Sequence, residues 1–252
     1  MDCSTGSGWF DPRSTAKLLG MGTNIDIVAN DGFTFRGYVA EPAGTPKGAM
    51  IVVQEIFGVN SHIESVADGY AANGYLAIAP ALFDRLERGV ALGYTGDDMK
   101  RGVELARTRT DFQRAVADVL DTAGVARDRL AAAGVVGGKV ACVGYCWGGV
   151  VTAAVSVSGS SAMDAAICYY GTGSVNFVEQ PLTMPLQMHF GDQDASIPAT
   201  DIDKMRASWP TAEIYVYEGH HGFNCDQRPQ GDKALADLAL SRVHAFLNAS
   251  FA

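Results

Sequence analysis

The sequence predicts an α/β protein built on a mostly parallel, doubly wound sheet. Several short runs are apolar without alternation, as expected for strands that helices cover on both faces. Helical segments alternate with these runs from residue 48 to the C-terminus. Residues 23–252 contain no linker-like stretch and no internal repeat. We therefore expect one α/β domain over residues 23–252, preceded by a short extension.

Residues 1–22 are rich in glycine, serine and threonine and show little periodicity. We interpret them as an N-terminal extension, either native or a remnant of cloning, that is poorly ordered or lies on the surface. Regular structure then begins with two alternating runs, 23–28 and 33–39, separated by the turn sequence Asn30-Asp31-Gly32. This pattern predicts a β-hairpin that forms an antiparallel edge of the sheet.

The central part of the chain alternates buried strands with helices. The run 49–53 is continuously apolar, and Ser61-His62-Ile63-Glu64 has the spacing of a capping box that opens a helix to about residue 73. Gly74 ends this helix, and 75–80 forms the next buried strand. An irregular, glycine-containing loop over 81–97 and helical segments over 98–133 follow.

The C-terminal part continues the alternation. A strand at 140–143 leads through a turn into a helix, and a short helix is expected at about 200–208. Further strands are expected at 165–170, 186–190 and 213–217. The chain closes with an amphipathic helix whose apolar positions include Leu235, Leu238, Val243, Phe246 and Leu247.

The composition narrows the function class. A net charge of −9 argues against nucleic acid or an anionic membrane as the main partner. No apolar run approaches the roughly 18–20 residues of a membrane helix, and the N-terminus lacks the pattern of a secretory signal. We expect a cytoplasmic enzyme, monomeric or a small homo-oligomer, that acts on a small molecule.

The five cysteines do not predict a disulfide framework, because their number is odd and their spacing scattered. Cys142 and Cys146 lie four residues apart, but no CxxC pattern or nearby histidine accompanies them, so a zinc site there is not expected. Most of the cysteines are expected to be buried thiols in a reducing compartment.

Cys146 occupies the middle of Gly144-Tyr145-Cys146-Trp147-Gly148, directly after the strand 140–143. This Gly-x-nucleophile-x-Gly outline is where many hydrolases present a serine on a sharp turn. The N–H groups and dipole of the following helix favour a thiolate and an oxyanion beside it. Alone, the motif leaves catalysis and a buried thiol equally plausible.

Two further reactive residues follow other strands. His221 lies in the loop after 213–217, where a general base can reach the nucleophile turn, and His220 competes for this role. Asp192 and Asp194 follow the strand 186–190, and either could orient the imidazole or serve only as a turn residue. We favour His221 and Asp194. The resulting order of nucleophile, acid and histidine is that of α/β-hydrolases.

Glu55 follows the buried strand 49–53. A charged residue there can be a polar strand end, but it can also bring its carboxylate beside the thiol and change the proton balance of the cysteine. The backbone N–H groups of Ile56 and Trp147 would then form an oxyanion hole.

Taken together, these motifs resemble the dienelactone hydrolase family, the carboxymethylenebutenolidases. The resemblance covers about residues 23–250 and rests on Gln54–Asn60, Gly144–Gly149, the Asp194 turn and His221-Gly222-Phe223. It implies an α/β-hydrolase fold and a triad of Cys146, Asp194 and His221, without a metal or organic cofactor. It also implies that Glu55 pairs with the resting cysteine until substrate binding frees it to take the thiol proton.

One departure from the family concerns the substrate. The resemblance implies that two arginines bind a substrate carboxylate, one upstream of the nucleophile and one just after the histidine. Here the position four after His221 is Cys225, and the nearest arginine is Arg228. Of the upstream arginines we name Arg101, with Arg228, as a candidate for substrate binding; the other upstream candidates are Arg85, Arg88, Arg107 and Arg109. The motifs therefore support assignment to the hydrolases more strongly than they support any particular substrate.

Two other functions remain open at this point. A non-catalytic α/β-hydrolase-fold protein that binds a small ligand would be favoured by full burial of Cys146 with no cavity beside it. A thiol redox sensor based on Cys146 is weaker, because Cys142 should face away along the strand and offer no resolving partner.

Overall fold

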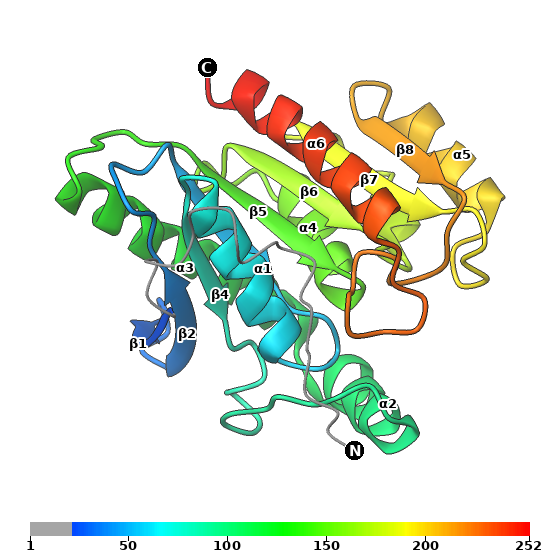
Figure 1. Ribbon diagram of the computed structural model, residues 1–252, viewed down its shortest axis with the longest axis horizontal. Helices are drawn as coiled ribbons and strands as arrows, with labels where there is room; N and C mark the ends of the chain where they lie inside the picture. The colour runs from blue at the N-terminus through cyan, green and yellow to red at the C-terminus, as the bar shows by residue number, and fades with distance from the viewer. Residues whose placement is uncertain (1–21) are drawn as a thin grey trace, which may run out of the picture.

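The computed structural model describes residues 22–252, so the expected N-terminal extension lies almost wholly outside the described residues. Within this range eight strands form one sheet in the order β1-β2-β4-β3-β5-β6-β7-β8 (Figure 1). β1 pairs antiparallel with β2, and β2 antiparallel with β4, whereas every other pairing is parallel. The predicted mostly parallel sheet with an antiparallel edge hairpin is confirmed.

The strands coincide with the apolar runs of the sequence. Those from β3 to β7 are buried throughout, which explains why their sequences do not alternate. β1 and β8 lie at the two edges of the sheet, and their exposed residues interrupt the apolar pattern. The bounds are β1 Thr23–Val28, β2 Thr34–Ala40, β3 Ala49–Val53, β4 Leu76–Pro80, β5 Val140–Tyr145, β6 Ala165–Tyr169, β7 Leu186–Gly191 and β8 Glu213–Tyr217.

Helices cover both faces of the sheet. α1 and α6 lie in front of it in Figure 1, whereas α3 and α4 pack against each other behind it. The helices are α1 Ser61–Ala72, α2 Gly96–Val103, α3 Phe112–Ala132, α4 Trp147–Ser156, α5 Ala199–Ser208 and α6 Lys233–Ser250, with a π-helical turn η1 Glu104–Arg109 and a 3₁₀ turn η2 Ser174–Phe177. Among the described residues, no helix combines the length and apolarity needed to cross a membrane.

One helix cap differs from the sequence-based expectation, and the structure shows where the expected helical segments over 98–133 divide. The side chain that caps α1 is that of Asn60, which accepts a hydrogen bond from the Ile63 N–H at 3.2 Å, rather than that of Ser61. The helical region 98–133 is divided, because the backbone and hydroxyl of Thr110 both donate to the carbonyl of Leu105. Asp111 then caps a new helix, α3. The division ends α2 and the π-helical turn before α3 begins.

Candidate active site

Cys146 ends β5 and begins α4 in a strained backbone conformation, with φ +55° and ψ −115°. Its N–H donates to the Tyr169 carbonyl at 3.0 Å, which fixes the turn against β6. A Cβ on Gly144 would lie 2.0 Å from the Gly148 carbonyl oxygen, and one on Gly148 would lie 2.4 Å from that of Gln54. The two glycines therefore allow the sharp turn, which leaves the Cys146 side chain partly exposed.

Asp194 and His221 meet across the ends of β7 and β8. The His221 Nδ1 lies 2.6 Å from Asp194 Oδ2. The other carboxylate oxygen of Asp194 accepts hydrogen bonds from the Ser196 N–H at 2.9 Å and the Ser196 hydroxyl at 2.5 Å. Because the Asp194 side chain is only 1% exposed, these partners hold its carboxylate in one orientation toward the imidazole.

The competing residues take backbone-stabilising roles. Asp192 Oδ1 accepts a hydrogen bond from the Gly219 N–H at 3.2 Å, as a turn residue does, and His220 Nδ1 lies 3.3 Å from the Gln193 carbonyl. The main chains after β7 and β8 are also in direct contact, because a Cβ on Gly191 would lie 2.1 Å from the Gly219 carbonyl oxygen. The structure thus brings Asp194, and not Asp192, to His221.

The electrostatics of the pair favour a protonated imidazole. Burial lowers the pKa of His221, but Asp194 and the neighbouring Cys146 outweigh burial and raise this pKa to about 10. Burial likewise raises the pKa of Asp194, and the His221 and Ser196 hydrogen bonds outweigh it and lower this pKa below its usual value. An imidazolium held by a carboxylate and placed beside a thiol is an arrangement that supports nucleophilic catalysis.

The backbone N–H groups of Ile56 and Trp147 remain available for a ligand. Trp147 is the first residue of α4, so its N–H has no partner within the helix. Across the described residues, neither N–H donates a hydrogen bond within the protein. Two such donors beside a nucleophile turn can hold the oxygen of a tetrahedral intermediate.

Glu55 is fully buried just beyond β3. Its Oε2 accepts a hydrogen bond from the Tyr94 hydroxyl at 3.3 Å, and its Oε1 lies 3.4 Å from Arg228 Nη1. These are the hydrogen bonds that the structure gives Glu55, so this carboxylate is held in a different pairing from the one with Cys146 that the family resemblance implies. Glu55 and Cys146 still lie near each other, because both act on Arg228. Burial is the largest single effect on the pKa of Arg228 and lowers it, but Glu55, Cys146 and other neighbours together raise this pKa above its usual value.

Comparison with known proteins shows the family of this chain. The sequence model of the dienelactone hydrolase family matches residues 35–251. The chain belongs to this family. It is 34% identical over 232 residues to a protein of Azospirillum brasilense named "Putative carboxymethylenebutenolidase", with 89% of this chain and 97% of the relative aligned. It is 30% identical over 203 residues to the carboxymethylenebutenolidase of Pseudomonas putida, with 78% and 84% aligned.

A solved structure supports the same fold. The crystal structure named "Putative Dienelactone Hydrolase" from Klebsiella pneumoniae superposes with a TM-score of 0.74 and 29% identity, covering 90% of this chain and 98% of that one. The expected α/β-hydrolase fold is therefore confirmed for this member of the dienelactone hydrolase family.

The two arginine candidates have different surroundings in this family member. Arg228 is 11% exposed at the side chain, pairs with Glu55 and lies over the rings of Phe57 and Tyr94, 6.0 and 5.8 Å from their centroids. Arg101 is 34% exposed on α2 and pairs with Glu87 and with Glu104. The structure thus brings Arg228, but not Arg101, into contact with a candidate site residue.

Several residues around the site carry no sequence signal of their own. Tyr94 reaches Glu55 from a loop that is irregular in sequence. Tyr170 adopts φ +38°, and its ring centroid lies 5.1 Å from that of His221. His62 on α1 lies 3.1 Å from Asp226, although its position in the first turn looked like an ordinary helix residue. These contacts arise from tertiary packing and could be found only in the folded chain.

The described cysteines are all free, and Cys142 is fully buried in β5. Its thiol faces Thr152, a residue that acts to lower the Cys142 pKa, although burial, the larger effect, raises this pKa to about 12. Cys142 therefore has none of the exposure or thiolate character that a resolving cysteine needs.

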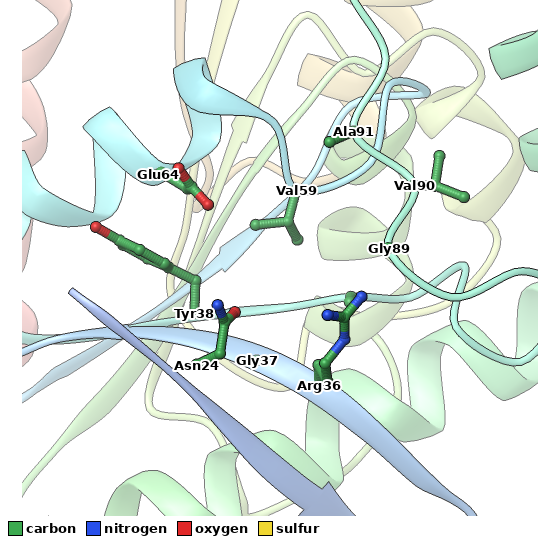
Figure 2. A pocket seen from close by; sticks show the side chains of 10 residues that line it. Asn24, Arg36, Gly37, Tyr38, Val59, Glu64, Gly89, Val90 and Ala91 are labelled. Atoms are coloured by element: carbon green, nitrogen blue, oxygen red, sulfur yellow. The ribbon is translucent and has the colours of Figure 1, made fainter. Parts of the chain in front are cut away.

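A pocket of about 180 Å³ lies between β2, the start of α1 and the loop 89–91 (Figure 2). Glu64 and Val59 approach it from one side, and Tyr38 and Arg36 project from β2 on the other (Figure 2). Neither the candidate triad nor Glu55 lines this pocket. It is a surface feature separate from the site around Cys146.

Proposed function

We propose that this hydrolase cleaves lactone or small activated ester bonds with Cys146 as the nucleophile. The observation that carries the proposal is the position of His221, between the Asp194 carboxylate at 2.6 Å and the thiol on the strained turn. Three residues from the ends of three strands converge at one point of the sheet. Acyl transfer through a cysteine requires a nucleophile, a histidine and an acid at one place, and three unrelated residues would rarely meet in this way by chance.

The reaction follows from these positions. The Cys146 sulfur attacks the carbonyl carbon, and Glu55 takes the thiol proton because His221 is already protonated. The oxyanion accepts hydrogen bonds from the N–H groups of Ile56 and Trp147. The C–O bond then breaks, the leaving oxygen takes a proton from His221, and a thioester remains on Cys146.

Hydrolysis of the thioester completes the cycle. Water attacks the thioester carbonyl while His221 accepts its proton, and the returning proton restores the thiol as the acid leaves. Asp194 keeps the imidazole in the orientation needed for both steps. No step needs a metal or an organic cofactor.

Glu55 and Arg228 point to the substrate class. A carboxylate on the substrate would compete with Glu55 for the guanidinium of Arg228, because both are anions that pair with arginine. We infer that such a substrate releases Glu55 from Arg228, after which Glu55 is free to take the thiol proton. A lactone or ester that carries a carboxylate is therefore the favoured substrate.

The alternative of a non-catalytic ligand-binding protein is less well supported. It would be favoured by a fully buried Cys146 and by a missing triad member. Cys146 is instead partly exposed, and His221 lies 2.6 Å from Asp194.

The first prediction concerns the nucleophile. Cys146→Ala removes the attacking sulfur, so turnover of an aryl ester should fall to background, at least about 10³-fold. Release of the phenol measures the rate, and circular dichroism shows that the fold persists. Cys142→Ala, on the same strand, is the matched control and should keep most of the activity. Comparable turnover by the Cys146→Ala and Cys142→Ala variants would disprove the nucleophile assignment.

A further inference from the structure

Three potential metal ligands lie together beside the proposed triad. A carboxylate oxygen of Glu55, a ring nitrogen of His62 and the sulfur of Cys225 all lie within 4.8 Å of one another. They come from the end of β3, the first turn of α1 and the loop between β8 and α6. All three residues are buried, with 0%, 3% and 0% exposure. Buried ligand groups of three types seldom meet without a stabilising partner.

His62 is oriented as a metal-binding histidine would be. Its Nδ1 lies 3.1 Å from Asp226 Oδ1, so this nitrogen is already engaged by a carboxylate. Its Nε2 is buried and has no hydrogen-bond partner among the described residues. Leaving such a nitrogen unpaired destabilises the folded chain. A histidine that binds a metal through one ring nitrogen usually has its other ring nitrogen hydrogen-bonded to a carboxylate, as His62 Nδ1 is here.

We propose that Glu55, His62 and Cys225 bind a divalent cation of the zinc class. A thiolate, an imidazole and a carboxylate together suit Zn²⁺, and three protein ligands leave a fourth position for water. With bonds of about 2.0–2.3 Å, ligand atoms around zinc stand about 3.3–3.8 Å apart. The cluster must therefore contract by about 1 Å. Cys225 can supply this movement because it lies in a loop outside the sheet.

The charge of the cluster is compatible with a dication. Two carboxylates belong to this cluster and its surroundings, since Glu55 pairs with Arg228 and Asp226 pairs with His62. Coordination releases the thiol proton of Cys225 and any proton on His62. The cation therefore enters a buried cluster largely in exchange for protons, which limits the added charge.

The site would control the reaction proposed above. Glu55 belongs to both groups, so a cation that coordinates its carboxylate keeps Glu55 from accepting the Cys146 proton. This consequence rests on the proposed function, whereas the binding of the cation does not. Occupancy of the site would hold the enzyme in an inactive state without touching the nucleophile.

Cobalt(II) is the probe for the site, because a cobalt–thiolate bond gives a near-ultraviolet charge-transfer band. The reduced full-length protein is titrated with Co²⁺, and the band should appear and saturate. It should persist in Cys146→Ser and in Cys168→Ser, which remove thiols outside the cluster, and disappear in Cys225→Ala. Asp226→Asn, which keeps all three ligands, should weaken binding about 10–100-fold.

Opposite results would overturn the site. The site is wrong if the unaltered protein gives no band, if Cys225→Ala gives a band of full strength, or if the band is lost only in Cys146→Ser. The last would place the cation on the triad instead. Circular dichroism of each variant separates a lost ligand from a lost fold.

The activity measurement separates this inference from the proposed function. Each variant is assayed with an aryl ester, and its rate with Zn²⁺ is divided by its own rate without metal. We expect a fall of at least tenfold for the unaltered protein and little change for Cys225→Ala. Cobalt binding without inhibition by zinc would contradict the role of Glu55. Loss of activity in Cys146→Ala, together with the absence of a cobalt band, would contradict the metal site and leave the proposed function standing.

Discussion

Cys146, the proposed nucleophile, has a backbone conformation that amino acids other than glycine rarely adopt. The strain costs about 1–3 kcal/mol and persists only because the flanking strands and glycines leave the chain no other path. The turn leaves Cys146 partly exposed, and the proposed mechanism requires His221 and the open N–H groups to act on what its sulfur attacks. The site is thus organised around one residue whose conformation the rest of the fold enforces.

The ion pair of His221 with Asp194 predicts a pH dependence of stability. The folded pKa of about 10 exceeds the ordinary value of 6.5, so the pair contributes fully below about pH 6.5. Its contribution declines as pH rises from about 6.5 and is gone above about 10. The difference in unfolding free energy between the unaltered protein and His221→Gln, measured in urea, should shrink over this range. A difference that grows with pH would contradict the ion pair.

Arg228 predicts substrate selectivity at the same scale. Arg228→Met removes the only candidate substrate arginine that contacts Glu55, so the preference for a carboxylate-bearing lactone over a neutral ester should fall about tenfold or more. The measurement is the ratio of kcat/KM for the two substrates. Arg101→Met is the matched control and should leave the ratio unchanged, because Glu87 and Glu104 already occupy its guanidinium. An equal loss on both substrates in Arg228→Met would argue against a role in carboxylate recognition.

At the scale of elements, α2 braces the loop that carries Ile56. A Cβ on Gly102 would lie 2.5 Å from the Ile56 carbonyl oxygen, so the helix backbone rests directly on the proposed oxyanion loop. Thr95 and Asp98 form a capping box that fixes the first turn of the same helix. The N–H group of Ile56 is therefore positioned by a helix that contributes no side chain to the chemistry.

This contact predicts the effect of a single methyl group. Gly102→Ala should displace Ile56 and lower kcat by about 10- to 100-fold, with little change in KM, because an oxyanion donor acts mainly in the transition state. Gly96→Ala in the same helix is the control, since a Cβ there meets nothing within 4 Å. Steady-state kinetics on an aryl ester decides the matter; equal rates for both variants would show that α2 does not position the loop.

At the scale of the molecule, Arg85 joins three distant segments. Its guanidinium makes two hydrogen bonds of 2.7 Å to Asp118 in α3 and two more, at 3.0 and 3.1 Å, to Asp31 in the hairpin turn. The Asp118 side chain is 1% exposed, and burial raises its pKa despite the opposing effect of Arg85. Arg85 thus neutralises a charge that the fold has taken out of water.

Removing this cation predicts a global loss of stability. Arg85→Met leaves Asp118 buried and unpaired, so the free energy of unfolding should fall by about 3–5 kcal/mol. Urea unfolding measures the change. Adding Asp118→Leu to Arg85→Met should recover much of the loss, because the double variant leaves no unpaired charge. A double variant less stable than Arg85→Met alone would show that the pair acts otherwise.

Much of this molecule could be predicted from its sequence. The inner strands appear as unbroken apolar runs because helices cover both of their faces. The carboxyl ends of parallel strands share one edge of the sheet, so the sequence alone predicts that Cys146, Asp194 and His221 lie near one another. Other features depend on contacts between distant segments. The pairing of Glu55 with Tyr94 and Arg228 joins residues 39 and 173 positions apart, and no local pattern predicts it. The Asn60 cap and the π-helical turn were missed because neighbouring residues offered competing hydrogen bonds.

The crossing of Gly191 and Gly219 has a consequence for how this enzyme can evolve. The acid and the histidine follow two main-chain segments that touch, where a Cβ on Gly191 would collide with the Gly219 carbonyl oxygen. Mutations that reshape the surrounding loops can therefore change what the enzyme accepts while the distance between Asp194 and His221 stays constant. Selection can explore new substrates without losing the chemistry, and Gly191 is the position at which this freedom ends.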